Sequence, residues 1–401
     1  MPREIKFCRI CNSRNLINIL NLGNQPPANS LHKKNEIIKK FPLKLVFCNK
    51  CKTAQLSITL SPKFLFSKYF WVTATSSTAI KHSKKFYKLT SKFISKNSNV
   101  VEIASNDGTF LKPFLKNKHK VLGVDPAKNI SKIANLNGIQ TLSEFFSEET
   151  SLKIKKKFNN IDLIFARNVI PHVKNIHSVV KGISNLANDK SIVAIEFHYA
   201  KDIIKELQYD SIYHEHLFYF TIKTISNLFL KYNLYPFDVF TSPISGGSLV
   251  LIFSKKKIKK NKLLIKMIND EKKNKLNNVK IWKIFSKKVK SHAKKLKKEI
   301  LNSYKLNGKL FGYGASARSS TLLNYCKLSN KQFSFIIDQN KLKQGLYTPG
   351  TNIVIRSIKS SSRDIFNKNM LLLAWNFKDE ILKKIKNIGF KGKIILPIKK
   401  R

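Results

Sequence analysis

Between residues 98 and 199, short apolar runs alternate with segments that have the composition of helices. The runs read NVVEI, KVLGV, IDLIFA and SIVAIEF. Apolar runs of about four to six residues, separated by helical segments, are typical of a parallel sheet covered on both faces. The pattern therefore predicts an α/β fold with a doubly wound sheet, in which ligands bind beyond the carboxyl ends of the strands.

Polar residues follow the first two of these runs, where a ligand would bind. Glu102 ends the first run, the loop EIASNDG leads into a helix, and Asp125 ends the second run, where an acid can accept both ribose hydroxyls. This spacing predicts an S-adenosylmethionine site, in a loop that has fewer glycines than usual. No G-x-G-x-x-G stands here, which disfavours a nicotinamide cofactor, and a turn that only links strand to helix is the plain alternative. The expected cofactor residues are Glu102, Ala104, Asn106, Asp107, Gly108, Asp125, Pro126 and Asn168.

A second cluster, Tyr213-His214-Glu215-His216, runs directly into aromatic residues. A histidine beside a phenol and a carboxylate suits proton transfer. Two histidines two positions apart could instead bind zinc, but no neighbouring cluster of further ligands supports this, and any one of these residues alone would be read as structural. An extended strand would turn Tyr213 and Glu215 away from the histidines. We therefore expect a loop or bulge, with His214 as the bystander.

Two C-x-x-C pairs, Cys8/Cys11 and Cys48/Cys51, account for four of the five cysteines. Brought together, they supply four thiolates in the closed arrangement of a structural zinc site. Disulfides are the alternative, which a reducing cytosol disfavours. The fifth cysteine, Cys326, is expected to be packed beside a helix.

The chain is strongly basic, with 76 Lys and Arg against 23 Asp and Glu and a net charge of +53. Charged residues make up only 25% and the lysines are scattered, so lysine has replaced acidic residues at ordinary surface positions. A nucleic-acid surface would cluster its cations with aromatics, and we expect no nucleic-acid partner. The N-terminus MPREIKFCRIC has no apolar signal region, and no stretch is long enough to span a bilayer. We expect a soluble, cytoplasmic monomer.

Residues 255–306 contain neither proline nor glycine, and apolar residues recur at three- and four-residue steps. This periodicity predicts an amphipathic helix with a solvated lysine face that bridges two domains. An RNA- or membrane-binding helix is the alternative.

A second strand–turn–helix unit follows, in GKLFGYGASARSSTLLNY. Gly312-x-Gly314-x-x-Ala317 approximates a dinucleotide fingerprint, and Asp338 ends the next apolar strand. Such a turn at a helix N-terminus can hold any pyrophosphate, and Arg318 adds donors. A tight turn needed only for packing is the alternative.

Several segments in the same order carry a family resemblance. VVEIASNDGTFL, GVDPAKN, ARNVIPHV, EFHYAKDIIKELQYDSIYHEHLFYF, SGGSLVLIF, FGYGASARSSTLLNY and KQGLYTPGT resemble the nucleotide-sugar C-methyltransferases of the tetronitrose C-3′-methyltransferase type. The resemblance covers essentially the whole chain, including the cysteine pairs. It implies a zinc-binding domain (1–70), a class I methyltransferase domain (71–255), a lysine-rich helical connector (256–306) and a C-terminal Rossmann-like domain (307–401) that helps to hold a nucleotide sugar.

The resemblance also implies the chemistry. C-methylation of a ketosugar needs a base for the proton beside the carbonyl and donors for the enolate oxygen. By similarity His216 is the base, Glu215 its orienter or relay, and Tyr213 and His172 polarise the keto oxygen. The implied substrate is a nucleotide-diphosphate 4-keto-deoxysugar, methylated at C-3. The expected substrate-binding residues are Gly246, Gly247, Gly312, Gly314, Ala315, Arg318 and Lys343.

Two positions depart from the family pattern. Ser245 stands where family members often carry histidine, and Phe70 and Trp71 stand where a tyrosine-containing segment reaches the substrate, with Tyr69 just before them. For Gly246 and Gly247, a turn that feeds a strand is as good a reading as contact with a ligand.

Three other functions stay open at this point. An RNA methyltransferase would suit the charge and the cysteine pairs. A catalytically silent nucleotide-sugar binding protein would suit the glycine-poor loop. An NAD-dependent sugar oxidoreductase would use the Gly312 fingerprint.

Overall fold

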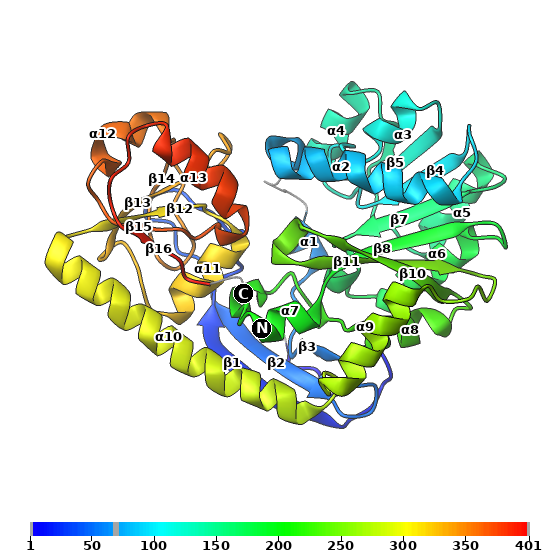
Figure 1. Ribbon diagram of the computed structural model, residues 1–401, viewed down its shortest axis with the longest axis horizontal. Coiled ribbons are helices and arrows are strands. Elements are labelled where there is room, and N and C mark those ends of the chain that lie inside the picture. Colours follow the sequence, from blue (N-terminus) through cyan, green and yellow to red (C-terminus); the bar gives the residue numbers. More distant parts are fainter. Residues whose placement is uncertain (1–2, 67–71, 399–401) are drawn as a thin grey trace.

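The computed structural model describes residues 3–66 and 72–398 and contains three sheets (Figure 1). The largest has seven strands in the order β10-β11-β8-β7-β4-β5-β6. Only β11 runs antiparallel to its neighbours. The strands are β4 (Asn99–Ile103), β5 (Lys120–Val124), β6 (Thr141–Leu142), β7 (Leu163–Arg167), β8 (Ile192–His198), β10 (Tyr235–Ser242) and β11 (Ser248–Ser254). This arrangement confirms the predicted doubly wound α/β fold.

Alternate residues of each strand face opposite sides of this sheet. Val100 packs into one core with Phe86, Phe110 and Phe114, while its neighbour Val101 belongs to the core on the other face. Both faces are buried, which is why the strands read as continuous apolar runs. The helices of this part are α2 (Ser77–Thr90), α3 (Lys112–Lys116), α4 (Lys128–Leu136), α5 (Glu148–Lys157), α6 (Ile176–Leu186), α7 (Ala200–Lys205) and α8 (Ile222–Leu230).

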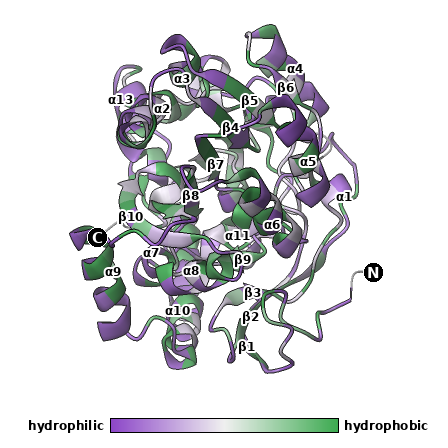
Figure 2. Ribbon diagram, turned by 90° about the vertical axis from the view of Figure 1, so that its right-hand side faces the viewer, coloured by the Kyte–Doolittle hydropathy of each residue, from purple (hydrophilic) through white to green (hydrophobic). Residues whose placement is uncertain are grey.

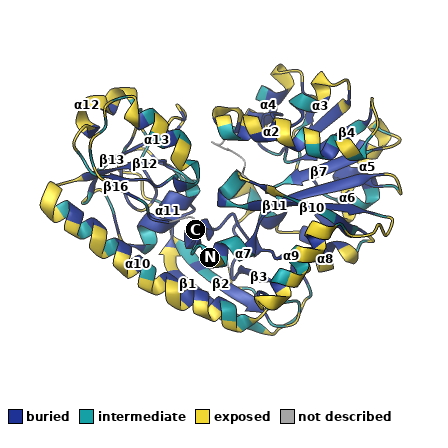
Figure 3. Ribbon diagram, viewed as in Figure 1, coloured by how far each residue is buried: buried dark blue, intermediate teal, exposed yellow. Residues whose placement is uncertain are grey.

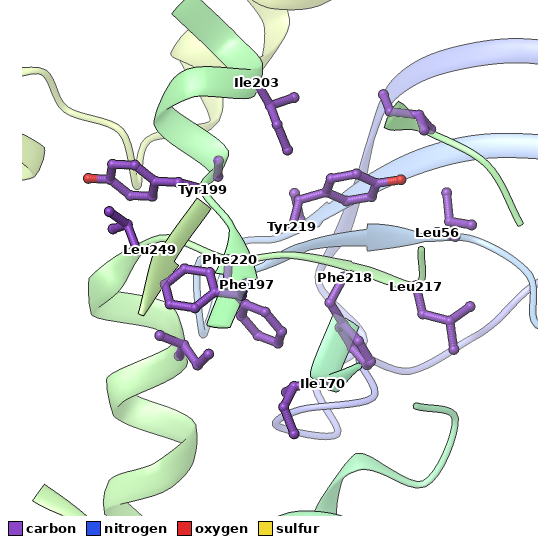
Figure 4. Close-up of a cluster of buried hydrophobic side chains, with 14 of the residues drawn as sticks. Leu56, Ile170, Phe197, Tyr199, Ile203, Leu217, Phe218, Tyr219, Phe220 and Leu249 are labelled. Atoms are coloured by element: carbon purple, nitrogen blue, oxygen red, sulfur yellow. The ribbon is translucent and has the colours of Figure 1, made fainter. Parts of the chain in front are cut away.

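The N-terminal sheet is antiparallel, in the order β1-β2-β3-β9. Its strands are β1 (Leu16–Gln25), β2 (Phe41–Cys48), β3 (Ala54–Leu56) and β9 (Phe218–Tyr219), and the short helix α1 (Pro62–Phe66) follows β3. Strand β9 comes from the segment after Tyr213–His216, and Ala54 pairs with Tyr219. In Figure 4, Leu217 lies near Leu56, while Phe220 lies near Phe197. The aromatic run LFYF therefore joins the N-terminal sheet to the core of the large sheet.

The lysine-rich connector is two helices, α9 (Lys262–Lys273) and α10 (Val279–Asn307), so the prediction of one continuous amphipathic helix was wrong. The break needs neither proline nor glycine, because Lys275 adopts a left-handed conformation (φ 51°) and the Asn278 side chain caps the start of α10. One face of α10 is buried and the other exposed (Figure 3), and purple and green alternate along α9 and α10 in Figure 2. Helix α10 runs from the N-terminal sheet to the C-terminal sheet (Figure 1).

The C-terminal sheet has five parallel strands in the order β14-β13-β12-β15-β16. The order reverses between β12 and β15, whose carboxyl ends therefore form the ligand-binding edge of such a sheet. The elements are β12 (Leu310–Tyr313), β13 (Phe333–Ile337), β14 (Ile355–Arg356), β15 (Met370–Leu371), β16 (Ile394–Ile395), α11 (Ala317–Tyr325), α12 (Ser362–Ile365) and α13 (Lys378–Lys386). In the part of the chain that the structure describes, no helix is long and apolar enough to cross a membrane.

Candidate active site

The large sheet and the C-terminal sheet lie on opposite sides of the molecule (Figure 1). A cavity of about 720 Å³ is lined by residues at the carboxyl edges of both sheets. The loops after β4, β5 and β7 line one side, and the loops after β12, β13 and β15 line the other. Tyr213, His216 and His172 lie on the wall between them. Both sheets thus contribute their ligand-binding edges to a single cavity.

Asp125 organises the cofactor side of the cavity. Its carboxylate accepts hydrogen bonds from the backbone N–H groups of Asn106 and Ala127, both at 2.9 Å. The loop holds Ala104 and Asn106 in left-handed conformations (φ 56° and 51°), the conformation that glycines usually supply. Ala104, Asn106, Asp125, Pro126 and Asn168 line the cavity, as a cofactor site at this edge requires.

The Asn-Asp-Gly part of this loop has structural partners. Asn106 Oδ1 accepts from the Thr73 N–H at 2.9 Å, and Asp107 Oδ2 accepts from the Ala74 N–H at 2.9 Å. These bonds hold the turn that precedes α2 against the cofactor loop. Gly108 has φ 75°, and a Cβ there would meet Ile139 at 2.8 Å. Asp107 and Gly108 therefore shape the site from outside the cavity lining.

Glu102 lies away from the cavity, which the sequence did not predict. It is completely buried, and its Oε1 accepts from Arg167 Nε at 3.0 Å. Burial raises the pKa of Glu102 to about 8, and Arg167 opposes that rise. Arg167 also lies 3.8 Å from Glu196 and does line the cavity. Sequence analysis missed Arg167, although a single arginine closing the apolar run IDLIFAR was a usable signal.

The Tyr213–His216 segment is a turn, and its four side chains divide into two pairs. Tyr213 and His216 face the cavity. His216 Nδ1 donates to the Ser211 carbonyl at 2.8 Å, which leaves Nε2 to accept from the Tyr213 hydroxyl at 2.7 Å. Burial lowers the pKa of His216 well below its usual value, and His172 and His198 lower it further. His216 is thus a neutral imidazole with its basic nitrogen on the cavity side.

His172 completes this wall from the turn after β7. Its ring centroid lies 4.6 Å from that of His216. Burial lowers the pKa of His172 to about 4, while hydrogen bonds to the backbone of Glu215 and Asn168 oppose that change. A neutral imidazole at this position can donate a hydrogen bond without carrying a charge.

His214 and Glu215 point toward the N-terminal sheet. His214 Nε2 donates to the Pro42 carbonyl at 3.2 Å, and Glu215 Oε1 accepts from Asn29 Nδ2 at 3.1 Å. Burial raises the pKa of Glu215 to about 7. The group that orients His216 is the Ser211 carbonyl, so the hydrogen bonds of Glu215 do not match the orienting role inferred by similarity.

On the C-terminal side, Gly314, Arg318 and Lys343 line the cavity. Lys343 Nζ donates to the Ala315 carbonyl at 2.7 Å and lies 3.3 Å from Asp338, which ties the glycine turn to the loop after β13. Ala315 contributes its backbone to this tie. A Cβ on Gly312 would meet Leu373 and Ile336 within 3 Å, so Gly312 serves packing.

Gly246 and Gly247 form the turn before β11 rather than lining the cavity. A Cβ on Gly246 would meet Trp375 Cη2 at 2.6 Å, and one on Gly247 would meet Asp202 Oδ2 at 2.6 Å. The neighbouring Ser245, where the family often has histidine, does line the cavity. Of the two readings for this pair, the structure favours the turn. The prediction that involved Tyr69, Phe70 and Trp71 lies outside the described residues.

The four cysteines of the C-x-x-C pairs converge at the edge of the N-terminal sheet. Their Sγ atoms all lie within 4.8 Å of one another, with Cys8–Cys51 at 3.6 Å and Cys11–Cys48 at 3.5 Å. No disulfide joins any two of them. Zinc with Zn–S bonds of about 2.3 Å needs sulfur atoms about 3.8 Å apart in a tetrahedron. The cluster fits such an ion.

Several residues close to the site were not anticipated from the sequence. Apart from Ser211, whose partner is the nearby His216, each has a hydrogen-bond partner that is distant in the chain. They are Asn29, Arg167, His198, Gln208, Asp210, Ser211 and Trp375.

Comparison with known proteins agrees with this architecture. Residues 8–66 match a family described as "Putative zinc binding domain", residues 79–237 a "Methyltransferase domain" and residues 243–398 a "C-methyltransferase C-terminal domain". The fold and these matches define an S-adenosylmethionine-dependent methyltransferase.

The chain is similar to C-methyltransferases over nearly its whole length. It is 29% identical over 408 residues to the C-methyltransferase NovU of Streptomyces niveus, covering 99% of this chain and 96% of that protein.

Two similar solved structures each cover less than half of this chain. The PH0226 protein of Pyrococcus horikoshii OT3 has a TM-score of 0.37 at 13% identity and covers 46% of this chain and 95% of its own. A SAM-dependent methyltransferase of Thermotoga maritima, described as a possible histamine N-methyltransferase, has a TM-score of 0.34 at 16% identity, over 45% and 90% of the two chains.

Proposed function

We propose that this methyltransferase transfers a methyl group to carbon, at C-3 of a nucleotide-diphosphate 4-keto-deoxysugar. One observation carries the proposal. A single cavity runs from the cofactor edge of the large sheet, past Tyr213, His172 and His216, to the glycine turn of the C-terminal sheet. A substrate that spans it would present its reactive carbon to the histidines and its diphosphate to the glycine turn.

His216 supplies the base. Its Nε2 carries the lone pair because Nδ1 is held as a donor by the Ser211 carbonyl, and this lone pair accepts from the Tyr213 hydroxyl at 2.7 Å until the hydroxyl turns to the keto oxygen of the substrate. Nε2 takes the proton from the carbon beside the carbonyl, and the electron pair moves onto the keto oxygen as the enolate forms. Tyr213 and His172 are the donors placed to stabilise that oxyanion.

S-adenosylmethionine, when bound, supplies the electrophilic methyl group that the substrate carbon takes up. Asp125 is placed to accept the ribose hydroxyls, and the backbone of Ala104 and the side chain of Asn168 face the same space.

The cysteine cluster has a structural role in this proposal. Four thiolates would close the coordination of zinc and leave no open position for chemistry. The ion would hold the ends of β2 and its neighbouring loop, and so the sheet that receives β9.

The C-terminal domain is proposed to hold the nucleotide diphosphate. Gly314 brings the backbone close to the cavity, with φ 99°, and Lys343 provides a buried positive charge beside it. The Asp338 carboxylate accepts from the Ala315 and Asn340 N–H groups, both at 2.9 Å, just as Asp125 accepts from two backbone N–H groups at the cofactor edge, so NADH fluorescence quenching is the measurement that separates bound NAD from a nucleotide sugar here.

Mass spectrometry tests the proposal. The full chain is incubated in deuterated water with S-adenosylmethionine and either dTDP-4-keto-6-deoxyglucose or its 2-deoxy form. His216→Gln is compared with His214→Gln, because the two histidines share one turn and only His216 faces the cavity. A product with a methyl group in place of hydrogen, lost in His216→Gln and kept in His214→Gln, is the expected result.

Other outcomes have separate meanings. Deuterium exchange beside the carbonyl without methylation would retain the base and contradict the cofactor site. If neither deuterium exchange nor methylation occurs, although calorimetry verifies S-adenosylmethionine binding, the sugar substrate is refuted and RNA would be tested next.

A further inference from the structure

Helix α11 of the C-terminal domain packs directly on the segment that carries the catalytic turn. Thr321 Oγ1 donates to the Ile212 carbonyl at 3.1 Å. One turn earlier on the same helix, Arg318 reaches the residues just before it. The turn that holds His216 is therefore supported from a different domain, about one hundred residues further along the chain.

Arg318 uses its guanidinium mainly on protein groups. Nη2 donates to the Ser245 carbonyl at 2.7 Å and to Gln208 Oε1 at 3.1 Å, and Nη1 lies 3.7 Å from Asp210 Oδ2. The guanidinium also lies over the Trp375 ring, 4.9 Å from its centroid. Only 8% of Arg318 is exposed. Nη2 is thus engaged by protein groups, including His198 Nε2 at 3.3 Å, whereas Nη1 makes no hydrogen bond among the residues that the structure describes and has the Asp210 carboxylate as its neighbouring charge.

Two partners of the Asp210 side chain come from the C-terminal domain, besides the backbone of Asp210 and Ser211 themselves. Trp375 Nε1 donates to Asp210 Oδ2 at 2.7 Å, and Arg318 supplies the nearby positive charge. Asp210 is fully buried and lies outside the cavity lining. A buried carboxylate is costly unless it is paired, so the position of Asp210 depends on these two residues.

A single peptide unit connects Asp210 to the carbonyl group that orients His216. Asp210 precedes Ser211, and the Ser211 carbonyl accepts the proton of His216 Nδ1 at 2.8 Å. A displacement of Asp210 would move this carbonyl, and with it the orientation and tautomer of the imidazole.

We propose that Arg318 and Asp210 form an inter-domain ion pair that positions His216, so that the C-terminal domain orients the base as well as binding substrate. The inference rests on the proposed function for the role of His216. It reassigns Arg318 from diphosphate ligand to positioning residue.

The two roles of Arg318 predict different kinetics. A diphosphate ligand would raise KM when replaced, and Asp210, which does not line the cavity, would have no effect. A positioning pair lowers kcat when either partner is replaced, because a small misplacement of a catalytic group can cost about a hundredfold in rate.

The test uses full-length Arg318→Gln, Arg318→Lys and Asp210→Asn. Arg356→Gln is the matched control, because Arg356 also pairs with an acid (Asp364, 3.1 Å) and lies 4.9 Å from an aromatic ring centroid, but on the exposed side of the same domain. We expect kcat to fall about a hundredfold in Arg318→Gln and Asp210→Asn, with KM within threefold or so of wild type. Arg318→Lys should recover part of the loss, and Arg356→Gln should match wild type.

A second readout needs no substrate. Nitrogen chemical shifts of labelled histidine should show His216 as the Nδ1–H tautomer in wild type and as a mixture in Arg318→Gln and Asp210→Asn. If wild type fails to turn over the ketosugar, the proposed function fails, while the tautomer measurement still decides the positioning role.

Three results would overturn the inference. The first is an unchanged His216 tautomer with wild-type kcat in either variant. The second is a raised KM alone in Arg318→Gln. The third applies if Arg318→Gln does not fold. A fully active Asp210→Asn chain would then show that the ion pair supports folding and does not position His216.

Discussion

Replacement of Glu215 by glutamine should stabilise the protein at neutral and alkaline pH and leave its stability unchanged in acid. The carboxyl group is buried within the Tyr213–His216 turn, and Asn29 Nδ2 donates a hydrogen bond to its side chain. Glutamine keeps the shape and can accept the same bond through its carbonyl oxygen. The substitution therefore removes the charge while retaining the contact.

The magnitude follows from the pKa of Glu215, which burial raises from 4.5 to about 7. Below pH 4.5 the carboxyl group is protonated in the folded and unfolded chains alike. Between 4.5 and about 7 it ionises only in the unfolded chain, so the free energy of unfolding falls by about 1.4 kcal/mol for each pH unit. The full loss is about 3 kcal/mol above pH 7, and Glu215→Gln should recover an amount of that order.

Urea unfolding followed by tryptophan fluorescence at pH 5, 6, 7 and 8 measures this difference. Glu144→Gln is the control, because Glu144 is exposed and paired with Lys153 at 2.8 Å, and a surface pair contributes less than about 1 kcal/mol. A stability difference between Glu215→Gln and wild type that stays constant with pH would refute the reasoning.

Three further outcomes are expected. Cys48→Ser should lose bound zinc by metal analysis and lower the Tm, because four thiolates close the site; undiminished metal content would contradict this. Asp125→Ala should weaken S-adenosylmethionine binding about ten- to a hundredfold by calorimetry, the effect of losing hydrogen bonds to a charged group. Gly246→Ala should destabilise the chain by about 1–3 kcal/mol more than Gly23→Ala in urea unfolding. Both glycines have φ 78°, but only at Gly246 would the new Cβ meet a side chain, Trp375 Cη2, at 2.6 Å; equal losses would exclude that clash.

Periodicity along the chain was enough to predict the large sheet, because strands buried on both faces give continuous apolar runs. The C-terminal sheet was expected from one strand–turn–helix unit and from the family resemblance. Periodicity could not predict strand β9. It has two residues, and its pairing with Ala54 depends on the tertiary fold. The break between α9 and α10 was missed because Lys275 and Asn278, not glycine or proline, end one helix and begin the next.

Within the site, residue type and order along the chain identified groups that could share a cavity, but not the direction of each side chain. Tyr213 and His216 face the cavity, whereas Glu215 between them faces Asn29. Glu102 illustrates the same limit, because its partner Arg167 comes from another strand. The order of residues along the chain does not give the turn geometry that points Glu215 away from Tyr213 and His216. It also does not give the neighbouring strand that brings Arg167 to Glu102.

The pairing of β9 with β3 has a consequence for how the protein is made. The N-terminal sheet leaves the ribosome first, yet its last strand is encoded beyond most of the methyltransferase segment. Until that strand arrives, β3 presents an open edge, and such edges promote association between chains. Contacts so distant in sequence also form slowly. The protein should therefore mature as one unit, and an excised methyltransferase segment would lack the strands against which its catalytic turn is built.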